Sequence, residues 1–356
     1  MTTRHQAVCR YGKYFCGFHG AGVILAAEVI EVAEYGTYDH DVLVIGAGAA
    51  GLSGAVALAR SRRSVAVVDA GEPRNAPADG VHALLGREGI APRDLVARGR
   101  EELRGYGGTV IDGRAAQASR GDDGLFSVVL DDGRALRSRR LLVATGLSDE
   151  LPDVAGLRQR WGRDVIHCPY CHGWEVRDQR IGVLATGPVS VHQTLLMRQL
   201  SDDVVFFAHT APPVDPRDRE RLAARGIEVV EGEVTAVQVD GDRLNGVGLA
   251  DGRVVERDAL TVSTRLAARA GFLAGVGLKP QEHPSGMGVH IPVEAGGRTK
   301  APGVWAAGNV TDLTAQVGAA AAAGTLAGAH INADLVAEET DRAVARMRAQ
   351  QPSPAA

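Results

Sequence analysis

The alternation of apolar and polar positions predicts a strand, a helix and a second strand at the start of the regularly patterned part of the chain. Residues 41–45 and 64–69 are short, β-branched apolar runs, and residues 51–60 between them have helical composition. Such apolar runs are typical of parallel strands that are buried on both faces. Their order over about 30 residues predicts a βαβ unit.

A second βαβ pattern follows further along the chain. Residues 180–185 and 204–208 are apolar strand-like runs, and a helical stretch between them extends to residue 200. Alternating segments broken by hairpin signals fill residues 109–142, and further turn signals follow the second βαβ pattern. The turn signals are Asp122-Asp123-Gly124, Asp131-Asp132-Gly133, Asp240-Gly241 and Asp251-Gly252. Two nucleotide-domain-like halves are therefore expected.

The two ends of the chain differ from this pattern. Residues 303–308 predict one more short strand, and residues 316–335 a long Ala/Gly-rich helix. We predict that residues 336–356 form a charged, frayed tail. Residues 1–38 show no strand pattern and are either a true extension with a short helix or an over-extended start. We favour the second interpretation, with initiation near Val32, because the first strand normally begins such a fold.

Composition and charge restrict the class of protein. The chain has 356 residues, 45% of them apolar, so two domains with sizeable cores are expected. The net charge is only -4, so neither nucleic acid nor a membrane surface is expected as a partner. No apolar run is long enough for a transmembrane helix, and four cysteines are too few for a disulfide-stapled secreted scaffold. A cytoplasmic location follows by default.

The glycine-rich turn after the first strand carries the first chemical signal. Gly46, Gly48 and Gly51 form a GxGxxG fingerprint together with Ala47, Ala49 and Ala50. The glycines allow the tight turn, the approach of a pyrophosphate and close packing of helix on strand, and the helix N-terminus attracts the phosphates. Asp69 ends the next strand, where a carboxylate accepts hydrogen bonds from the adenosine ribose. The sequence therefore predicts a dinucleotide site.

The second signal is the pair Cys168 and Cys171, in the sequence Cys168-Pro169-Tyr170-Cys171. A CxxC pair at a helix start has a lowered thiol pKa, which suits thiol–disulfide exchange. Two other interpretations stay open: half of a zinc site, completed by Cys9 and Cys16 or by neighbouring histidines, and a pair of inert core cysteines. We expect a redox pair and no metal.

Two further short motifs complete the set. One is Ala144-Thr145-Gly146, which follows a predicted strand, and the other begins with Gly308-Asn309 and leads to Gln316 and Val317 at the start of the long helix. Taken with the fingerprint and the CxxC pair, these motifs resemble the thioredoxin reductase-like family of two-domain flavoproteins. The resemblance covers residues 40–335, and the four motifs stand in the family's order.

The resemblance implies an α/β fold with two Rossmann-like domains. The FAD domain would be discontinuous, over residues 39–150 and 260–335, and an NAD(P)-binding-like domain over residues 151–259 would carry the CxxC pair. Cys171 matches the cysteine that faces the flavin, and Cys168 matches the one that meets the substrate. Gly308 and Asn309 match a pair that contacts the FAD ribitol and phosphate, while Gln316 and the helix start after it match the element at the flavin's pyrimidine edge. A homodimer is also implied.

The sequence departs from the family in the middle domain. The second nucleotide turn reads Ala185-Thr186-Gly187-Pro188-Val189-Ser190, so the first glycine is lost and Pro188 removes an N–H donor. The segment after the next strand, residues 209–213, has no arginine for the 2′-phosphate of NADPH. NADPH is therefore doubtful as a cofactor.

The residue after the second cysteine is His172, where the family has an aspartate. The sequence Cys171-His172-Gly173-Trp174-Glu175 resembles the dithiol oxidases of gliotoxin- and holomycin-type products, which use oxygen, and His172 would act as a base. A surface or capping histidine is the alternative. We expect an FAD-dependent oxidase of a small-molecule dithiol. The alternatives are an NADPH-dependent reductase of a thioredoxin-like protein and a flavin-binding redox sensor.

Overall fold

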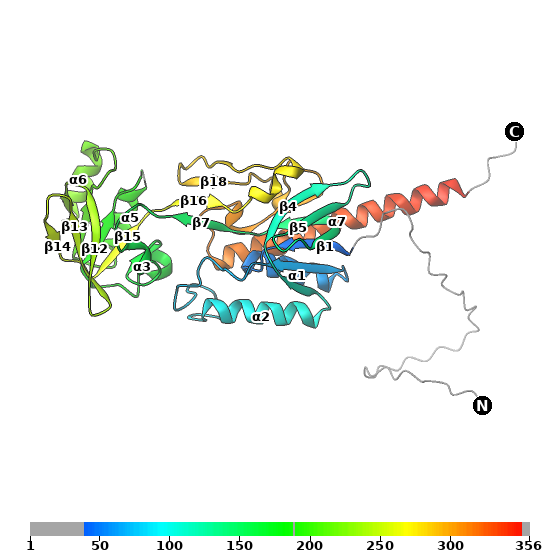
Figure 1. Ribbon diagram of the computed structural model, residues 1–356, viewed down its shortest axis with the longest axis horizontal. Coiled ribbons are helices and arrows are strands. Elements are labelled where there is room, and N and C mark those ends of the chain that lie inside the picture. Colours follow the sequence, from blue (N-terminus) through cyan, green and yellow to red (C-terminus); the bar gives the residue numbers. More distant parts are fainter. Residues whose placement is uncertain (1–38, 188, 351–356) are drawn as a thin grey trace, which may run out of the picture. The chain divides into compact units, whose positions relative to one another are not determined.

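The first sheet of the protein is built mainly from parallel strands. The computed structural model describes residues 39–187 and 189–350. β1 pairs in parallel with β2 and β6, β2 with β3, and β19 with β6, while β4 and β5 extend the sheet as an antiparallel hairpin (Figure 1). The strands are β1 (His40–Ile45), β2 (Val65–Asp69), β3 (Thr109–Asp112), β4 (Ala115–Arg120), β5 (Phe126–Leu130), β6 (Ala135–Val143) and β19 (Val304–Ala306).

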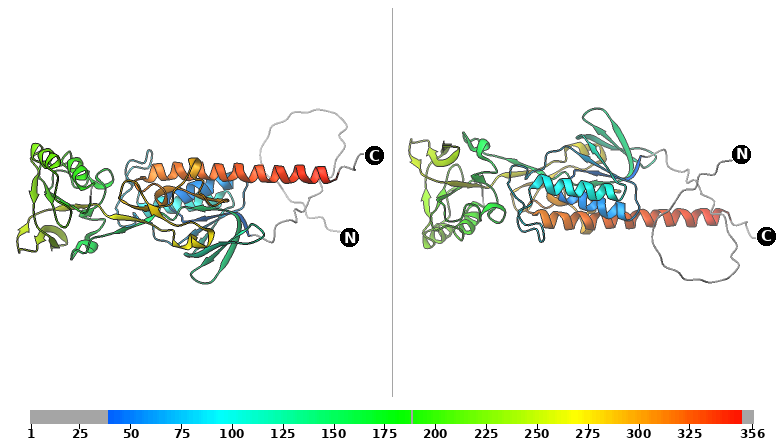
Figure 2. Two further views of the ribbon diagram at one scale, coloured as in Figure 1. Left: turned by 90° about the horizontal axis from the view of Figure 1, so that it is seen from above. Right: turned by 90° about the horizontal axis from the view of Figure 1, so that it is seen from below.

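Three helices run beside this sheet: α1 (Ala49–Arg60), α2 (Pro92–Gly105) and α7 (Val317–Ala349). Figure 2 shows α1 between the other two. The contact between α1 and α7 is very close, since a Cβ atom built on Gly324 would lie 1.9 Å from the carbonyl oxygen of Ala50. A Cβ atom built on Gly328 would lie 2.7 Å from the carbonyl oxygen of Gly54. The Ala/Gly composition of α7 is thus a requirement of helix packing.

The second sheet is entirely parallel and follows the order β11-β10-β9-β15-β8. Its strands are β8 (Val165–Ile166), β9 (Ile181–Leu184), β10 (Val204–Phe207), β11 (Glu228–Val230) and β15 (Ala259–Val262). Helices α5 (Ser190–Met197) and α6 (Pro216–Ala224) connect neighbouring strands. An antiparallel sheet of β12 (Val234–Asp240), β13 (Arg243–Leu249) and β14 (Val254–Val255) is inserted before β15.

The chain passes from the first sheet to the second and back along two strands that pair with each other. β7 (Leu147–Glu150) and β16 (Arg265–Ala268) are antiparallel, with Glu150 opposite Arg265. β17 (Gln281–Glu282) and β18 (Gly288–His290) extend this small sheet. The remaining short helices are α3 (Leu157–Arg160), α4 (Pro169–His172), η1 (Gly271–Val276), η2 (Ala295–Gly297) and η3 (Gly308–Val310).

The α/β fold class, both βαβ units and the four hairpin turns are confirmed. The predicted end of the last helix at residue 335 is wrong, because α7 continues to Ala349. Two of the charges that suggested a tail are paired with the first sheet: Glu338 bonds to Arg140 and to the buried Arg139, and Glu339 also bonds to Arg139. The domain limits at residues 150, 259 and 335 stay a prediction.

Two other predictions concern the ends of the chain and the membrane. Residues 1–38, with Cys9 and Cys16, and residues 351–356 lie outside the described part of the chain. Within residues 39–187 and 189–350, no helix has both the length and the apolar character that a bilayer span requires.

The close contact of α1 with α7 generates a stability prediction. Gly324→Ala should lower the free energy of unfolding by about 2 kcal/mol or more, because the added methyl group meets the Ala50 backbone. Urea denaturation followed by circular dichroism measures this. The control is Gly105→Ala, at the end of α2, where a Cβ has no neighbour within 4 Å. It should be neutral or stabilise by up to about 1 kcal/mol, and equal midpoints for the two variants would contradict the packing argument.

Candidate functional site

The glycine fingerprint lies between the end of β1 and the start of α1. Gly46 has a φ of +107°, and a Cβ there would lie 2.4 Å from the carbonyl oxygen of Ala144. A Cβ on Gly51 would lie 1.8 Å from the oxygen of Gly46, so this residue permits the contact of helix with strand. Gly48 instead faces open space, with nothing within 4 Å of an added Cβ. The turn therefore leaves room for a ligand beside the N-terminus of α1.

A cavity of about 910 Å³ extends from this turn to the cysteine pair. It brings together nearly all the residues that the sequence singled out. Gly51 is the exception, since it does not line the cavity. The predicted residues on the cavity wall are Gly46, Gly48, Ala49, Ala50, Asp69, Ala144, Thr145, Gly146, Cys168, Cys171, His172, Gly308, Asn309, Gln316 and Val317.

Asp69 lies at the end of β2, as predicted, but it has a partner that the sequence did not suggest. One carboxylate oxygen accepts the backbone N–H of Gly71 at 2.8 Å, and the other accepts the guanidinium of Arg100 on α2. A ribose hydroxyl would therefore share this carboxylate with Arg100. The pairing joins residues 31 positions apart, and no local pattern predicts it.

The other end of the cavity is held by a turn in front of α7. The side-chain amide of Asn309 donates to the carbonyl oxygens of Asp312 and Ala315, at 3.1 and 2.8 Å. This fixes the position of Gln316, the N-cap residue of α7. The hydroxyl of Thr145 is buried and has no hydrogen-bond partner in the described part of the chain. An orphaned hydroxyl on a cavity wall fits a bound polar group, and the donor set as a whole fits a dinucleotide.

The cysteine pair lies at the start of the short helix α4. Cys168 is the N-cap residue, and the two cysteines form a disulfide with a Cα–Cα distance of 5.2 Å. The carbonyl of Cys168 accepts the N–H groups of Cys171 and His172, at 3.2 and 3.1 Å. The predicted helix start is confirmed, and both cysteines line the large cavity.

His172 is neither an exposed nor a capping histidine. Both ring nitrogens are buried, and neither has a hydrogen-bond partner among the residues that the structure describes. Burial lowers the pKa of His172, although the nearby carboxylate of Glu175 opposes this. The imidazole is therefore neutral near pH 7, which is the form that accepts a proton.

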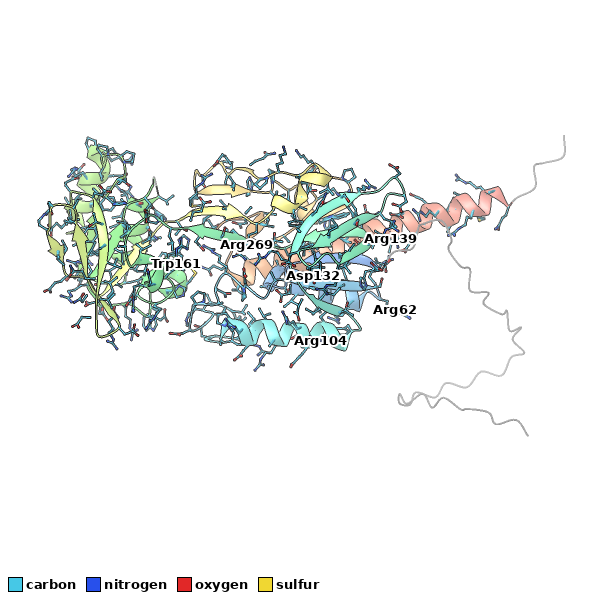
Figure 3. All side chains as sticks on the ribbon, in the orientation of Figure 1. Arg62, Arg104, Asp132, Arg139, Trp161 and Arg269 are labelled. Atoms are coloured by element: carbon cyan, nitrogen blue, oxygen red, sulfur yellow. A yellow bond between two sulfur atoms is a disulfide. The ribbon has the colours of Figure 1, made fainter. Side chains whose placement is uncertain are left out.

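Sequence reasoning missed an ion pair on the wall of the cavity. The guanidinium of Arg74 donates two hydrogen bonds of 2.7 Å to the carboxylate of Asp149 in β7, and the hydroxyl of Thr264 donates a third at 2.6 Å. Asp149 is 8% exposed, and Arg74 is 27% exposed. Trp161 and Arg269 line the same wall (Figure 3). No sequence motif marks Arg74 and Asp149, because 75 residues separate them.

Comparison with known proteins shows which family this site belongs to. Residues 40–324 match the family model described as pyridine nucleotide-disulphide oxidoreductase. The chain belongs to this family, and it is an FAD-dependent oxidoreductase of the thioredoxin reductase-like type. The predicted family, fold and flavin cofactor are thereby confirmed.

The relatives include proteins of the predicted branch. The chain is 31% identical to "Thioredoxin reductase tcpT" of Claviceps purpurea, over 84% of this chain and 95% of the relative. It is 32% identical to "Thioredoxin reductase sirT" of Leptosphaeria maculans, over 82% and 93%. Among solved structures, HlmI is similar with 46% identity and a TM-score of 0.82, over 87% of this chain and 97% of HlmI.

A zinc site at the cysteine pair would need two further ligands. Within residues 39–187 and 189–350, no group of three or more His, Cys, Asp or Glu side chains is arranged to hold a metal ion. Cys9 and Cys16 lie outside the described residues.

The buried pair of Arg74 with Asp149 predicts a pH-dependent stability. Burial raises the pKa of Asp149, but Arg74 and Thr264 outweigh it, so the folded-state pKa lies below its ordinary value. The pair therefore stabilises the fold above about pH 4, and this stabilisation is lost as the pH falls through the lowered pKa. Asp149→Asn should lower the free energy of unfolding by about 2 kcal/mol at pH 7, and the difference from wild type should shrink below about pH 4.

Urea denaturation between pH 3 and pH 7 measures this difference. The matched control is Asp132→Asn, at a residue labelled in Figure 3. Asp132 forms an exposed pair with Arg134, so this variant should change stability by less than about 1 kcal/mol. A deficit of Asp149→Asn that is the same at every pH would show that the ion pair is not its cause.

Proposed function

We propose that this protein is an FAD-dependent oxidase that converts a small-molecule dithiol into its disulfide, with molecular oxygen as the electron acceptor. The observation that carries the proposal lies in the second nucleotide turn, where the hydroxyl of Ser190 accepts backbone N–H groups that a nucleotide phosphate would need. With a weakened nicotinamide site, the flavin would receive its electrons from the cysteine pair.

The turn between β9 and α5 is closed by Ser190. Its hydroxyl oxygen accepts the backbone N–H groups of Thr186 and Gly187, at 3.1 and 3.3 Å. Ser190 is 1% exposed. In a nucleotide-binding turn, such N–H groups bind the pyrophosphate. A phosphate could use them here only if the Ser190 hydroxyl moved away and lost both hydrogen bonds.

The segment after β10 also lacks the features of a nicotinamide site. His209 has a φ of +49°, and its Nδ1 accepts the backbone N–H of Val234 at 3.1 Å, so this ring is held within the domain. Residues 209–213 offer no guanidinium to a 2′-phosphate. Pro188, the other departure from the nucleotide fingerprint, lies outside the described residues.

The proposed chemistry uses the two cysteines and His172. His172 accepts the proton of the first substrate thiol, and the resulting thiolate attacks Sγ of Cys168, so that Cys171 leaves as a thiolate. The second substrate thiol then attacks the mixed disulfide, releasing the cyclic disulfide and the Cys168 thiolate. FAD, when bound, would supply the two-electron chemistry: it would accept the electron pair of the two cysteine thiolates, and this pair, with the two protons released by the substrate thiols, would reduce dioxygen to hydrogen peroxide. The balance is one dithiol and one dioxygen to one disulfide and one peroxide.

The cofactor would be held by the residues that line the large cavity. The N-terminus of α1 and Gly48 would receive the pyrophosphate, Asp69 the adenosine ribose, and Asn309 and Gln316 the flavin end. Cys171 would face the flavin and Cys168 the substrate, as the resemblance implies. A homodimer and a cytoplasmic location are part of the same proposal.

The second candidate is an NADPH-dependent reductase of thioredoxin-like proteins. The printed names of the relatives tcpT and sirT favour it, and thiol–disulfide exchange runs in either direction. A third candidate, a redox sensor, would share the site but turn over slowly.

An anaerobic titration separates the three candidates. We expect that NADPH leaves the visible flavin band unchanged, whereas a small dithiol such as dithiothreitol bleaches it and air restores it. Rapid bleaching by NADPH would overturn the oxidase proposal and support the reductase. Very slow bleaching by either reductant would support the sensor. Peroxide formed in air, one per dithiol consumed, is the independent readout.

The cysteine that meets the substrate is tested separately. Cys168→Ser should lower dithiol turnover at least 1000-fold while the FAD absorbance of the purified protein is retained, because the nucleophilic exchange is lost but the cavity is not. Loss of FAD in this variant would show instead that the cysteine pair is structural.

A further inference from the structure

We propose that Gln193 is a positioning residue for the redox pair: it fixes the peptide bond between His167 and Cys168 and thereby the placement of both sulfurs. The inference deepens the proposed function by adding a residue to its site. It holds whether the flavin gives electrons to oxygen or receives them from a nicotinamide nucleotide, since both routes use the same sulfur pair.

The cysteine-bearing helix is not placed by core packing alone. None of the four residues of α4 is buried. Tyr170, between the two cysteines, is 66% exposed. A segment whose side chains all stay at least partly exposed gains less free energy from packing than a core helix does. Hydrogen bonds from neighbouring elements therefore add to its placement.

Gln193 supplies such a bond from helix α5. Its side-chain amide nitrogen donates to the carbonyl oxygen of His167 at 2.5 Å, and its amide oxygen accepts the hydroxyl of Ser263 at 2.7 Å. Gln193 is only 7% exposed. The carbonyl can only accept, so the amide orientation is set by its partners and not by a choice between oxygen and nitrogen.

The bonded carbonyl belongs to the peptide unit that enters Cys168. This unit is planar, so holding its oxygen also restricts the direction in which the chain enters Cys168. The imidazole of His167 is held independently, with Nδ1 3.3 Å from the carbonyl of Val262. Gln193 and Val262 thus hold the residue in front of the redox pair from α5 and β15.

The same bonds reach the closed nucleotide turn. The hydroxyl of Thr186 donates to the carbonyl of Ser263, whose own hydroxyl holds Gln193. Ser190 and Gln193 stand one helical turn apart on α5. Helix α5 thus contacts the nucleotide turn through Ser190 and the residue in front of Cys168 through Gln193.

The first test is Gln193→Met, which keeps the volume but removes both hydrogen bonds. We expect the limiting rate of anaerobic flavin bleaching by dithiothreitol to fall at least tenfold, because small displacements of reacting groups cost large factors in rate. The concentration of dithiothreitol at half-saturation should change little. FAD content and the urea midpoint report whether the variant is folded.

A second readout does not depend on the flavin. Loosening the His167–Cys168 peptide lowers the effective concentration of one thiol near the other, so the disulfide should become easier to reduce by about tenfold, or about 30 mV. Equilibration with glutathione buffers, followed by thiol labelling of the full-length protein and mass spectrometry, measures it.

Gln193→Glu gives a signature that a merely structural role does not produce. A protonated carboxyl group donates to the His167 carbonyl and accepts from Ser263, as glutamine does, whereas an ionised carboxylate cannot donate. The bleaching rate of Gln193→Glu relative to Gln193→Met should therefore rise toward acidic pH. The ratio cancels titrations that both variants share, including those of His167, His172, Asp149 and the thiols.

The matched control is Thr194→Val, which removes the neighbouring buried hydroxyl of α5 and its bond to the Ser190 carbonyl. It should leave the bleaching rate and the disulfide equilibrium within twofold of wild type. Equal effects of Thr194→Val and Gln193→Met would overturn the proposal in favour of general helix packing, as would a folded Gln193→Met with wild-type rate and equilibrium. If Gln193→Met does not fold, Ser263→Ala decides: a slower rate supports the proposal, and a wild-type rate overturns it.

Discussion

The structure depends on backbone-to-backbone contact around helix α1, which only glycine allows. Gly51 lies against the carbonyl of Gly46, and Gly324 of α7 lies against that of Ala50. Together these contacts bring the fingerprint turn, the strand end at Ala144 and the start of α7 to one place. A side chain at either glycine would separate elements that must share a cavity wall. The cavity beside the fingerprint turn is therefore a consequence of how closely two helices and a sheet approach.

The two nucleotide turns of the chain share a fold but not a chemistry. In the first, the N-terminus of α1 faces open space beside Gly48. In the second, the backbone donors already bond to the Ser190 hydroxyl. The two turns thus differ in whether their backbone donors face a cavity or are satisfied within the protein. In the proposed function, the part of the chain with the second turn serves the reaction by holding the cysteine pair.

The elements and the cysteine pair were predictable from sequence because their signals are local. The apolar runs of β1, β2, β9 and β10 and the Asp-Gly turns each act within a few residues. The extent of α7 was not predictable in this way. Its charged end reads as a solvated tail, and only the folded chain places Arg139 and Arg140 beside Glu338 and Glu339.

In the site, too, local motifs were predictable from the sequence, and contacts between distant segments were not. The glycines, Asp69, the cysteines and His172 carry motifs, and the structure places all but Gly51 on one cavity wall. The pairs of Asp69 with Arg100 and of Arg74 with Asp149, and the bond from Gln193 to His167, join segments 26 to 75 residues apart. Nothing in a single sequence marks such partners. The burial that leaves His172 without a hydrogen-bond partner among the described residues is likewise a property of the tertiary structure alone.

The pairing of β7 with β16 has a consequence for the modularity of the chain. Glu150 and Arg265 face each other across the two strands, so the segment between them leaves the small sheet of β7 and β16 and returns to it at a single place. An insertion whose two ends are neighbours can be exchanged as a cassette, because a short loop would rejoin the host strands. The cysteine-bearing module could thus be replaced by one of different specificity while the flavin-binding frame keeps its chain path.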